Sequence, residues 1–328
     1  MQQNINTDYP IDVVIAWVDG NDESHFNKMS NYLEDKSKLN NQQFLTRFNQ
    51  VDEIEFSVKS ILKFAPFVRT IFIVTDEQVP LFLRGKVKRE KYPNVKIIDH
   101  KEIFAGFESY LPTFNSVSIE SMLYRIPNLA EHFIYFNDDL FLMKETKITD
   151  FFDKGFPVLR GKFKSFDTNT LYKVVHQKIV YWLGGKTKNK KYGYKKAQQN
   201  IAVKLGFKKY LRLDHTPASI RKTTIKNYFD NNPEMLIYNI QHRFRNPSQF
   251  MIQSLANHLE IKNMTCILKK DYQLLYFGSY KKPLIWYKFN LFLSDKNNNK
   301  LFLCLQSLDL CPKYKLDFFL NWLKKLIN

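Results

Sequence analysis

The chain has 328 residues, of which 44% are hydrophobic, and this composition excludes a disordered protein and allows a large buried core. Its formal net charge of +18 at pH 7 predicts an anionic partner, such as a lipid surface, an anionic polymer or a nucleic acid, unless it reflects a lysine-rich genome. Three cysteines without a CxxC pair fit no zinc spacing and favour free thiols in a reducing compartment. The sequence has neither a signal-peptide core nor an apolar run long enough to span a membrane, so we expect no membrane span.

Apolar runs and helical patterns alternate over residues 11–136, as in proteins built on a parallel sheet. The expected strands are short and rich in β-branched residues, whereas the expected helices carry apolar residues every three or four positions. In chain order, we expect strands over residues 11–18, 70–75, 95–98 and 133–136, and helices over residues 52–64 and 116–124. The sequence therefore predicts an α/β fold with a mostly parallel sheet flanked by helices.

Carboxylates follow several of these strands, and Asp138 and Asp139 stand directly after a strongly apolar one. Strands of a parallel sheet deliver such groups to one edge, where α/β proteins bind their ligands. The pair can cap a helix or form surface ion pairs, but two adjacent carboxylates repel each other unless a cation lies beside them. A hard divalent ion, Mg²⁺ or Mn²⁺, that bridges to a diphosphate fits this need. We therefore expect Asp138 and Asp139 to form a metal site for a nucleotide diphosphate.

The character of the chain changes after residue 152, which divides it into three expected parts. Residues 1–152 form the nucleotide-binding part. Residues 153–213 form a basic insertion or lid, because residues 151–214 hold 16 Lys and Arg against three acidic residues. Residues 214–328 form a mixed C-terminal part that opens with a helical region and has helices expected over residues 248–259 and from residue 316.

Two stretches are candidates for contact with a membrane or a glycan. The insertion mixes lysines with Tyr181, Trp182, Tyr192 and Tyr194, and we favour sugar stacking, lipid contact or a solvated surface over stacking on a nucleic acid. The last expected helix carries an apolar face between residues 316 and 327. For that face we favour core packing, with docking on a membrane surface as the alternative.

Ordered motifs run through the chain, namely Ile11-Asp12-Val13-Val14, Trp17-Val18-Asp19-Gly20, Ala65-Pro66-Phe67-Val68-Arg69, Ile73-Val74-Thr75-Asp76, Leu111-Pro112-Thr113-Phe114-Asn115-Ser116, Phe133 to Asp139, His215-Thr216-Pro217 and Phe244-Arg245. Together they resemble the conserved blocks of the Stealth family. These proteins are sugar-1-phosphate transferases of bacterial capsule synthesis, related to the catalytic subunit of the eukaryotic lysosomal-enzyme N-acetylglucosamine-1-phosphotransferase. The chain departs from the family at Cys304-Leu305-Gln306-Ser307, where the family usually shows Cys-Ile-Asn-Asp.

The resemblance implies a nucleotide-sugar-transferase-like fold and a set of site residues. It implies that Asp138 and Asp139 bind the metal and that Asp139, His215 and Arg245 act in catalysis. A base must take the proton of the acceptor hydroxyl, which suits His215, with a covalent role as nucleophile as the alternative. A guanidinium can hold phosphate oxygens with two parallel hydrogen bonds, which suits Arg245. The implied substrate-binding residues are Asp12, Asp19, Gly20, Asp76, Asn115, Ser116 and Arg243.

Several of these residues also have an ordinary structural explanation. Asp19 with Gly20, and also Asp76, can be turn residues, and Ser116 can be the N-cap of a helix. Asp12 lies inside an apolar run, where an ionised carboxylate is costly without a partner, and we therefore favour a site role for it.

We expect a transferase that moves a hexose or N-acetylhexosamine 1-phosphate from a UDP-sugar to a hydroxyl of a surface glycan, forms a phosphodiester and releases UMP. The alternatives are a metal-dependent glycosyltransferase that releases UDP and a non-catalytic basic module that binds glycan or nucleic acid. The expected partners are the UDP-sugar, the glycan acceptor, the anionic inner membrane and the capsule assembly machinery, without nucleic acid. The expected location is the cytoplasm, with a peripheral contact to the inner face of the cytoplasmic membrane.

Overall fold

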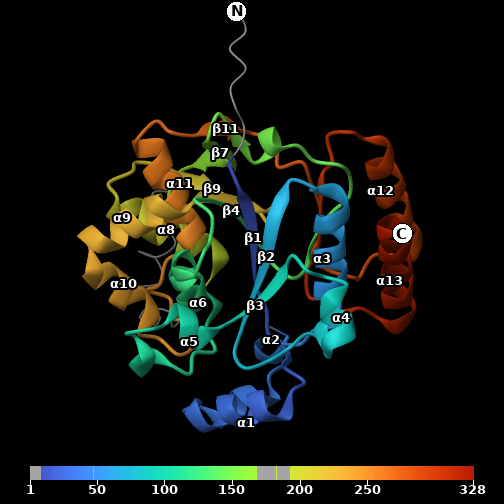
Figure 1. The fold of residues 1–328 in the computed structure, drawn as a ribbon, viewed down its shortest axis with the longest axis horizontal. Coiled ribbons are helices and arrows are strands. Elements are labelled where there is room, and N and C mark those ends of the chain that lie inside the picture. The colour runs from blue at the N-terminus through green and yellow to red at the C-terminus, as the bar shows by residue number, and fades with distance from the viewer. Residues whose placement is uncertain (1–8, 47, 168–181, 183–192) are drawn as a thin grey trace, which may run out of the picture.

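The centre of the molecule is a five-stranded sheet (Figure 1). The structure is a computed structural model, and it describes residues 9–46, 48–167, 182 and 193–328. The strand order of the sheet is β10-β4-β1-β2-β3. The pairs β4–β1, β1–β2 and β2–β3 are parallel, whereas β10 runs antiparallel to β4. This arrangement confirms the predicted α/β class and the four predicted strands. The strand bounds are Ile11–Ala16 for β1, Val68–Thr75 for β2, Val95–Asp99 for β3, His132–Phe136 for β4 and Ala218–Arg221 for β10.

The strands form where the sequence is β-branched and apolar because helices cover both faces of the sheet. Along β1, Val13 and Ile15 point to one side and join the core that contains Phe136 and Ile61. Val14 points to the other side and joins the core that contains Phe250. Successive residues of β1 point to opposite faces of the sheet, so the strand contributes side chains to two separate cores.

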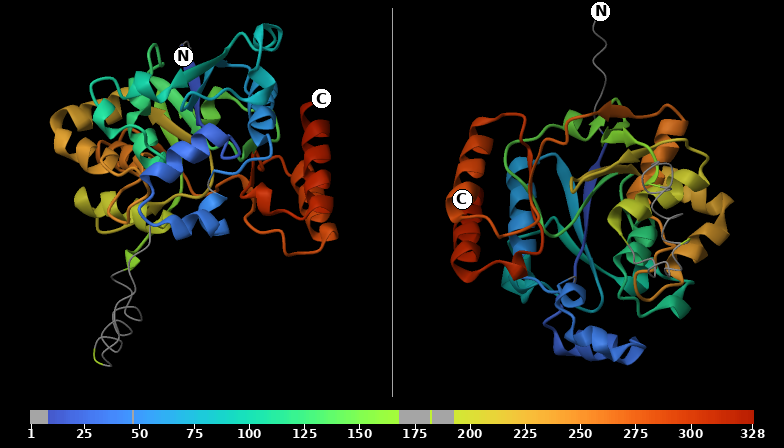
Figure 2. Two further views of the ribbon diagram at one scale, coloured as in Figure 1. Left: turned by 90° about the horizontal axis from the view of Figure 1, so that it is seen from below. Right: turned by 180° about the vertical axis from the view of Figure 1, so that it is seen from behind.

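Different helices cover the two faces of the sheet, as the views in Figures 1 and 2 show. Helix α3 (Glu53–Phe64) lies on one face, with α13 (Lys313–Ile327) outside it. On the other face lie α6 (Ser116–Met122), α10 (Pro233–Ile240) and α11 (Ile252–Lys262). The helix predicted over residues 116–124 ends as an α-helix at Met122 and continues as a 3₁₀ turn over Leu123–Arg125.

The region of the basic insertion contributes elements to the folded body. Strand β7 (Phe156–Arg160) pairs with β6 (Phe152–Asp153) and β11 (Ile267–Lys269), and β8 (Lys162–Lys164) pairs with β9 (Tyr210–Arg212). Helix α8 (Tyr194–Lys204) packs against α11. Of the aromatic residues singled out in the insertion, Trp182 is exposed, Tyr194 lies in α8, and Tyr181 and Tyr192 lie outside the described residues.

The C-terminal part differs from the expectation at its start. The sequence predicts a helical region after Asp214, but β10 comes first, because its residues complete the edge of the sheet by pairing with β4. Helix α9 (Lys222–Asn231) follows, and α11 begins four residues later than expected, at Ile252. A small sheet of β12 (Leu274–Phe277), β13 (Phe302–Leu305) and β5 (Leu140–Leu142) then leads to the last helices.

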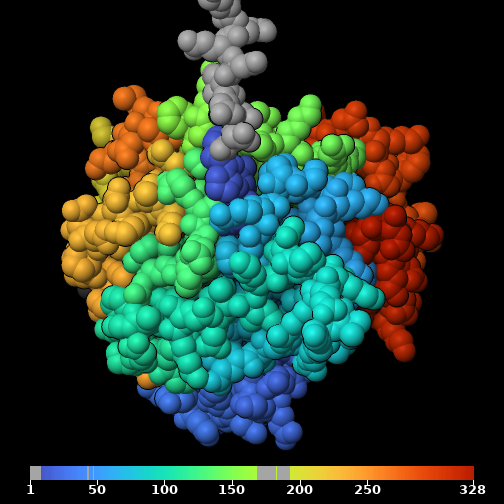
Figure 3. All heavy atoms as spheres, viewed as in Figure 1, coloured from blue at the N-terminus to red at the C-terminus, as the bar shows by residue number. Residues whose placement is uncertain are grey.

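The two last helices lie at one side of the molecule. The apolar face of α13 packs inward, with Phe319 and Leu323 fully buried, in agreement with the core-packing interpretation. Helix α12 (Leu284–Lys296) lies beside it, and the space-filling view in Figure 3 shows this side in red and orange. Among the described residues, no helix has both the length and the apolar character needed to cross a membrane.

The remaining elements are short and peripheral. Helices α1 (Glu23–Tyr32) and α2 (Gln42–Leu45), with a 3₁₀ turn over Lys36–Asn40, form the lower edge of the molecule in Figure 1. Helices α4 (Lys86–Glu90) and α5 (His100–Ile103) flank β3, and 3₁₀ turns cover Leu81–Leu83, Glu108–Tyr110, Ile148–Asp150 and Leu308–Leu310. The three cysteines are free, as predicted.

Candidate functional site

A cavity of about 520 Å³ opens at the carboxyl ends of β1, β2 and β4, which is the sheet edge predicted to bind the ligand. A volume of this size suits a small-molecule ligand. Residues from distant parts of the chain line the cavity, from the end of β1 to the turn after β13. Six predicted site residues line it, namely Asp76, Ser116, Asp138, Asp139, His215 and Arg245.

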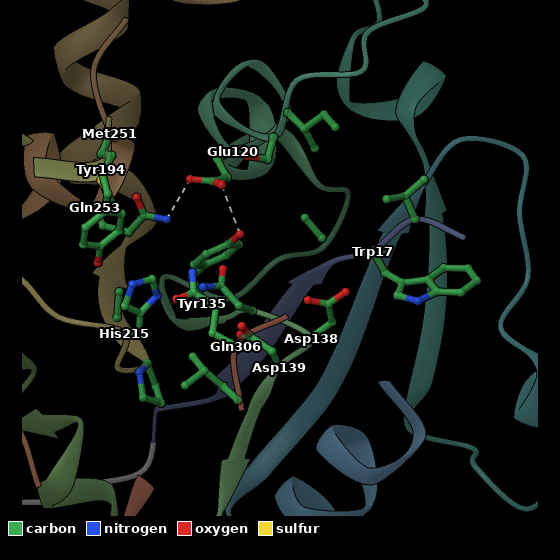
Figure 4. A pocket seen from close by; sticks show the side chains of 18 of the residues that line it. Trp17, Glu120, Tyr135, Asp138, Asp139, Tyr194, His215, Met251, Gln253 and Gln306 are labelled. Carbon is green, nitrogen blue, oxygen red and sulfur yellow. Dashed lines mark hydrogen bonds between the residues drawn. The ribbon is translucent and has the colours of Figure 1, made fainter. Parts of the chain in front are cut away.

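Asp138 and Asp139 occupy the turn between β4 and β5, and Figure 4 shows both side chains in the cavity. The Leu305 N–H donates to the carbonyl oxygen of Asp139 over 3.0 Å, which ties the turn to β13. Burial, reinforced by the charges of Asp139 and Glu53, raises the pKa of Asp138 well above its usual range. Burial also raises the pKa of Asp139, although His215 and Cys304 act in the opposite direction.

These two carboxylates fit a divalent cation. Asp139 Oδ1 is buried and has no hydrogen-bond partner among the described residues, and the repulsion between the two acids favours a cation beside them. The described residues contain no ready group of three His, Cys, Asp or Glu side chains for a metal. Magnesium usually takes one or two carboxylates and completes its six ligands with phosphate oxygens and water, so a pair of this kind suits an ion that binds together with a diphosphate.

His215 is held between two aromatic rings at one end of the cavity, as Figure 4 shows for Tyr194. Its imidazole stacks on Tyr194 with 4.7 Å between ring centroids and on Tyr276 with 5.2 Å, and both ring pairs are nearly parallel. The Tyr276 hydroxyl donates to Gln306 Oε1. This double stack restricts rotation of the imidazole and leaves its edge to face the cavity.

Arg245 belongs to a polar network on the α6 side of the cavity. Its Nη2 donates to Ser116 Oγ over 2.8 Å. Glu120, one turn further along α6, accepts hydrogen bonds from Tyr135 over 3.2 Å and from Gln253 over 2.9 Å (Figure 4). Burial raises the pKa of Glu120, and the nearby guanidinium of Arg245 acts against this effect.

Sequence reasoning missed four carboxylates of the cavity wall, namely Glu53, Glu120, Asp214 and Asp309. Glu53 is buried at the first turn of α3, and burial raises its pKa to about 7. Helical spacing could have indicated that Glu53 is buried, because the small residues Ser57 and Ser60, four and seven positions later, lie on the same buried side of α3. Asp309 accepts hydrogen bonds from Thr46 Oγ1 over 2.7 and 2.8 Å, and no local pattern pointed to this contact across the chain.

The neighbours of the cavity at the ends of β1 and β2 are tied to each other. Asp76 forms an ion pair with Lys28 over 2.9 Å. Asp19 comes directly after the residues that line the cavity at the end of β1. Its N–H donates to Gln78 Oε1 over 2.9 Å. Gly20 is required by the chain itself, because a Cβ there would lie 2.5 Å from the carbonyl oxygen of Phe48. Neither Asp19 nor Gly20 lines the cavity.

Asp12 does not lie in the cavity, and its carboxylate has structural partners instead. It lies near the start of β1, away from the carboxyl end, and is fully buried. It accepts two hydrogen bonds from Arg69, over 2.9 Å from Nε and 2.6 Å from Nη2, and one from the Ala130 N–H over 2.7 Å. The partner that a buried carboxylate needs is therefore an arginine of β2, not a ligand.

Asn115 and Arg243 also lie outside the lining of the cavity. Asn115, rather than Ser116, is the N-cap of α6, since its side chain accepts from the Val117 N–H over 3.2 Å. Arg243 donates to the carbonyl oxygen of Pro112 over 2.6 Å, and its guanidinium lies over the ring of Tyr32. Both side chains thus hold together the loops beside the cavity.

Comparison with known proteins finds two conserved regions in the first half of the chain. Residues 9–37 match the family model for Stealth protein CR1, conserved region 1. Residues 47–158 match the model for Stealth protein CR2, conserved region 2. The matched residues include Asp138 and Asp139 and end before His215 and Arg245.

Curated relatives of this chain are named as phosphotransferases. A capsular polysaccharide phosphotransferase of Haemophilus influenzae is 48% identical over 154 residues, which are 45% of this chain and 39% of that protein. One of Aeromonas hydrophila is 39% identical over 172 residues, 51% of this chain and 46% of that protein. An exopolysaccharide phosphotransferase of Streptomyces coelicolor is 42% identical over 146 residues, 44% of this chain and 25% of that protein. The chain thus spans less than half the length of each of these relatives, and it carries Stealth conserved regions 1 and 2, as its motifs predicted.

Proposed function

We propose that this chain transfers a sugar 1-phosphate from a UDP-sugar to a hydroxyl of a surface glycan, in the synthesis of a capsular or other surface polysaccharide. One observation carries the proposal. A single cavity holds an adjacent carboxylate pair, Asp138 and Asp139, together with the imidazole of His215 and the guanidinium of Arg245. The relatives of the chain are named capsular and exopolysaccharide phosphotransferases, which supports the same class of reaction.

In the proposed reaction, the acceptor oxygen attacks the phosphorus that carries the sugar. A new P–O bond forms, the bond from that phosphorus to the bridging oxygen breaks, and UMP leaves with the bonding electrons. His215 takes the proton of the acceptor hydroxyl, and Arg245 binds the oxygens of the transferring phosphoryl group. The anomeric bond of the sugar stays intact, so catalysis rests on positioning and on charge neutralisation.

Asp138 and Asp139 would hold Mg²⁺ or Mn²⁺ in this reaction. When bound, the cation neutralises charge on the diphosphate and on the leaving UMP. Without it, a dianionic ligand would meet two carboxylates at the end of β4, and repulsion would oppose donor binding.

The end of the cavity opposite His215 suits the nucleobase of the donor. Figure 4 shows Trp17 at this end, across the carboxylate pair from His215. Trp17 Nε1, both ring nitrogens of His25 and Thr113 Oγ1 are buried without hydrogen-bond partners among the described residues. The ring of Phe114 lies 5.4 Å from His25. A base that stacks on these rings and forms hydrogen bonds with these polar atoms would remove the free-energy cost of burying them without partners.

The proposal includes a nucleotide-sugar-transferase-like use of the sheet, in which the donor spans the carboxyl ends of β1, β2 and β4. The acceptor then approaches from the side of His215, where Tyr276 is 40% exposed and offers ring surface to a sugar. We propose the cytoplasm as the location of the reaction and the capsule assembly machinery as its setting.

The test is a reaction with a panel of UDP-sugars, Mg²⁺ or Mn²⁺, and an acceptor oligosaccharide, followed by identification of the released nucleotide. The proposal predicts UMP and a phosphodiester signal in the phosphorus NMR spectrum of the product. Release of UDP with a product that lacks phosphorus would identify a glycosyltransferase instead. Donor binding without any turnover would favour a non-catalytic glycan-binding module.

A further inference from the structure

Helix α12 carries apolar residues on two faces, and the described part of the chain covers one of them. Tyr287, Leu291 and Ser294 point inward and are buried, and the first two join the core that contains residues of α13 and β13. Ile285, Phe289 and Phe292, spaced by four and three residues, point outward and are 71%, 58% and 52% exposed. Trp286 and Leu293 extend this outer face. Isolated exposed apolar residues are ordinary, but a continuous stripe along a helix marks a contact surface.

Lysines surround this outer face, which is defined here as Ile285, Trp286, Phe289, Phe292 and Leu293. Lys281 and Lys282 precede the helix, Lys288 lies within it, and Lys296 ends it, all of them exposed. Lys296 Nζ lies 4.5 Å from the centroid of the Phe292 ring. Asp295 is the single acidic residue of α12. The apolar stripe is therefore bordered by positive charge.

This combination fits a lipid surface better than a protein partner. The core of a protein interface is depleted of lysine, whereas a helix that lies in a membrane interface joins an apolar face to lysines that meet anionic headgroups. Tryptophan, present here as Trp286, is enriched at that interface because its ring is apolar and its N–H is polar. The last helix, α13, offers no such face, since its apolar side is covered by the core.

We propose that the outer face of α12 docks this chain on the surface of an anionic phospholipid bilayer. The proposal is independent of the reaction catalysed. It also links the membrane to the cavity through a short path. Phe277 packs on Trp286 and Tyr287, with ring centroids 5.6 and 5.1 Å away, and its neighbour Tyr276 stacks on His215. A docked α12 would hold the cavity wall beside the bilayer, where a lipid-linked acceptor can reach it.

The direct test is flotation of the full chain with vesicles of phosphatidylcholine, with and without phosphatidylglycerol. We expect binding to the anionic vesicles that weakens as salt rises, because screening shortens the reach of the lysines. The double variant Phe289→Ser with Phe292→Ser should bind at least about tenfold less. The variant Lys281→Glu with Lys282→Glu should lose binding to the anionic vesicles and keep its melting temperature, which separates docking from folding.

Matched controls exist on α8. Val203 is 56% exposed, so Val203→Ser removes apolar surface elsewhere and should bind like the parent chain. Lys195→Glu with Lys196→Glu removes the same charge from the other candidate basic region and should cause a smaller loss than the Lys281 and Lys282 change. Loss of binding in the α8 lysine variant alone would assign the membrane contact to the insertion and overturn the proposal.

Tryptophan fluorescence gives a second readout. Lipids brominated near the headgroup should quench the parent chain, and Trp286→Phe should abolish most of that quenching, because Trp286 lies on the docking face. Unchanged vesicle binding by the Phe289 and Phe292 variant would refute the proposal. A dimer that forms without lipid and dissociates in that variant would show that a second copy covers the face. Neither result would bear on whether UMP is released.

Discussion

Arg245 donates a hydrogen bond from Nη2 to Ser116 Oγ over 2.8 Å, and this bond joins the loop after α10 to the first residue of α6. Both residues line the cavity, although 129 positions separate them in the chain. The hydroxyl orients the guanidinium before any substrate binds. A preorganised cation of this kind stabilises charge that develops on a phosphoryl group without a cost of reorganisation in the transition state.

Arg245→Ala should reduce turnover by about 10²–10⁴-fold, and Arg245→Lys should recover little of it, because a single ammonium cannot make two parallel hydrogen bonds to phosphate. Steady-state kinetics with the best UDP-sugar measures this. Arg243→Lys is the matched control, since Arg243 holds the carbonyl of Pro112 outside the cavity and should affect stability more than turnover. Equal losses of turnover in the two lysine variants would contradict the assignment.

Asp138→Asn and Asp139→Asn should each abolish most activity while the protein remains folded. In metal-free buffer, the Asp138 variant should melt at the same or a higher temperature than the parent, because the raised pKa of Asp138 shows that the folded protein resists its negative charge. Addition of Mn²⁺ with UDP should raise the melting temperature of the parent and leave both variants unchanged. Full activity of the parent in EDTA would assign the carboxylates to structure alone.

Glu53 should make the stability of the metal-free protein depend on pH. Its folded-state pKa of about 7 lies above its ordinary value of 4.5, so the folded state holds this proton more tightly than the unfolded state. The contribution of Glu53 to the free energy of unfolding is therefore greatest below about pH 4.5 and falls as pH rises to about 7, by about 3 kcal/mol in total. Denaturant titrations across this range should show a smaller slope in Glu53→Gln than in the parent, because the other buried carboxyl groups of the cavity keep their own contributions.

Glu55→Gln serves as the control for Glu53, because Glu55 lies on the outer side of the same helix and pairs with Lys59 over 2.6 Å. Its pH dependence should match that of the parent. If Glu53→Gln kept the full slope, the proton would reside on another group of the cavity.

Asp12→Asn should lower the free energy of unfolding by about 2 kcal/mol, because it weakens the hydrogen bonds of a buried carboxylate to Arg69 and to the Ala130 N–H. The KM for the donor should not change, since Asp12 lies away from the cavity. Asp76→Asn is the matched comparison, and it should change the donor KM because Asp76 lines the cavity. A raised donor KM in the Asp12 variant without a loss of stability would restore the role that the sequence suggested.

The strands and the acidic edge could be predicted because local patterns carry them. Runs rich in β-branched residues marked β1 and β2, and the position of Asp138 and Asp139 after β4 followed from the strand direction. Asp12 shows where this reasoning fails. A carboxylate in an apolar strand must have a partner, but sequence alone does not tell whether that partner is a ligand or Arg69.

The rest of the site depends on contacts between distant segments. Asp309 reaches the cavity and Tyr276 reaches His215 because β12 and β13 pair with β5, next to the turn of the carboxylates. Strand β10 has four residues, and its sequence predicts the start of a helix. Its pairing with β4 overrides that local preference. Such tertiary choices leave no periodic signal in the chain.

Tyr276 should act as a positioning residue for His215. Tyr276→Phe keeps the ring that stacks on the imidazole and loses only the hydrogen bond to Gln306, so it should retain most of the turnover. Tyr276→Ala removes the stack and should lower kcat by about 10²-fold with little change in the donor KM, because a misplaced base slows the chemical step rather than donor binding. Steady-state kinetics of both variants checks this split.

A double-mutant cycle separates positioning from general damage to the cavity. His215→Ala should lose about 10²–10⁴-fold in kcat, and adding Tyr276→Ala to it should cost almost nothing more, because the ring then has no imidazole to hold. Additive losses would mean that Tyr276 acts on the substrate itself, for example by stacking on the acceptor sugar. In that case, acceptor KM rather than kcat should rise in Tyr276→Ala and remain near the parent value in Tyr276→Phe.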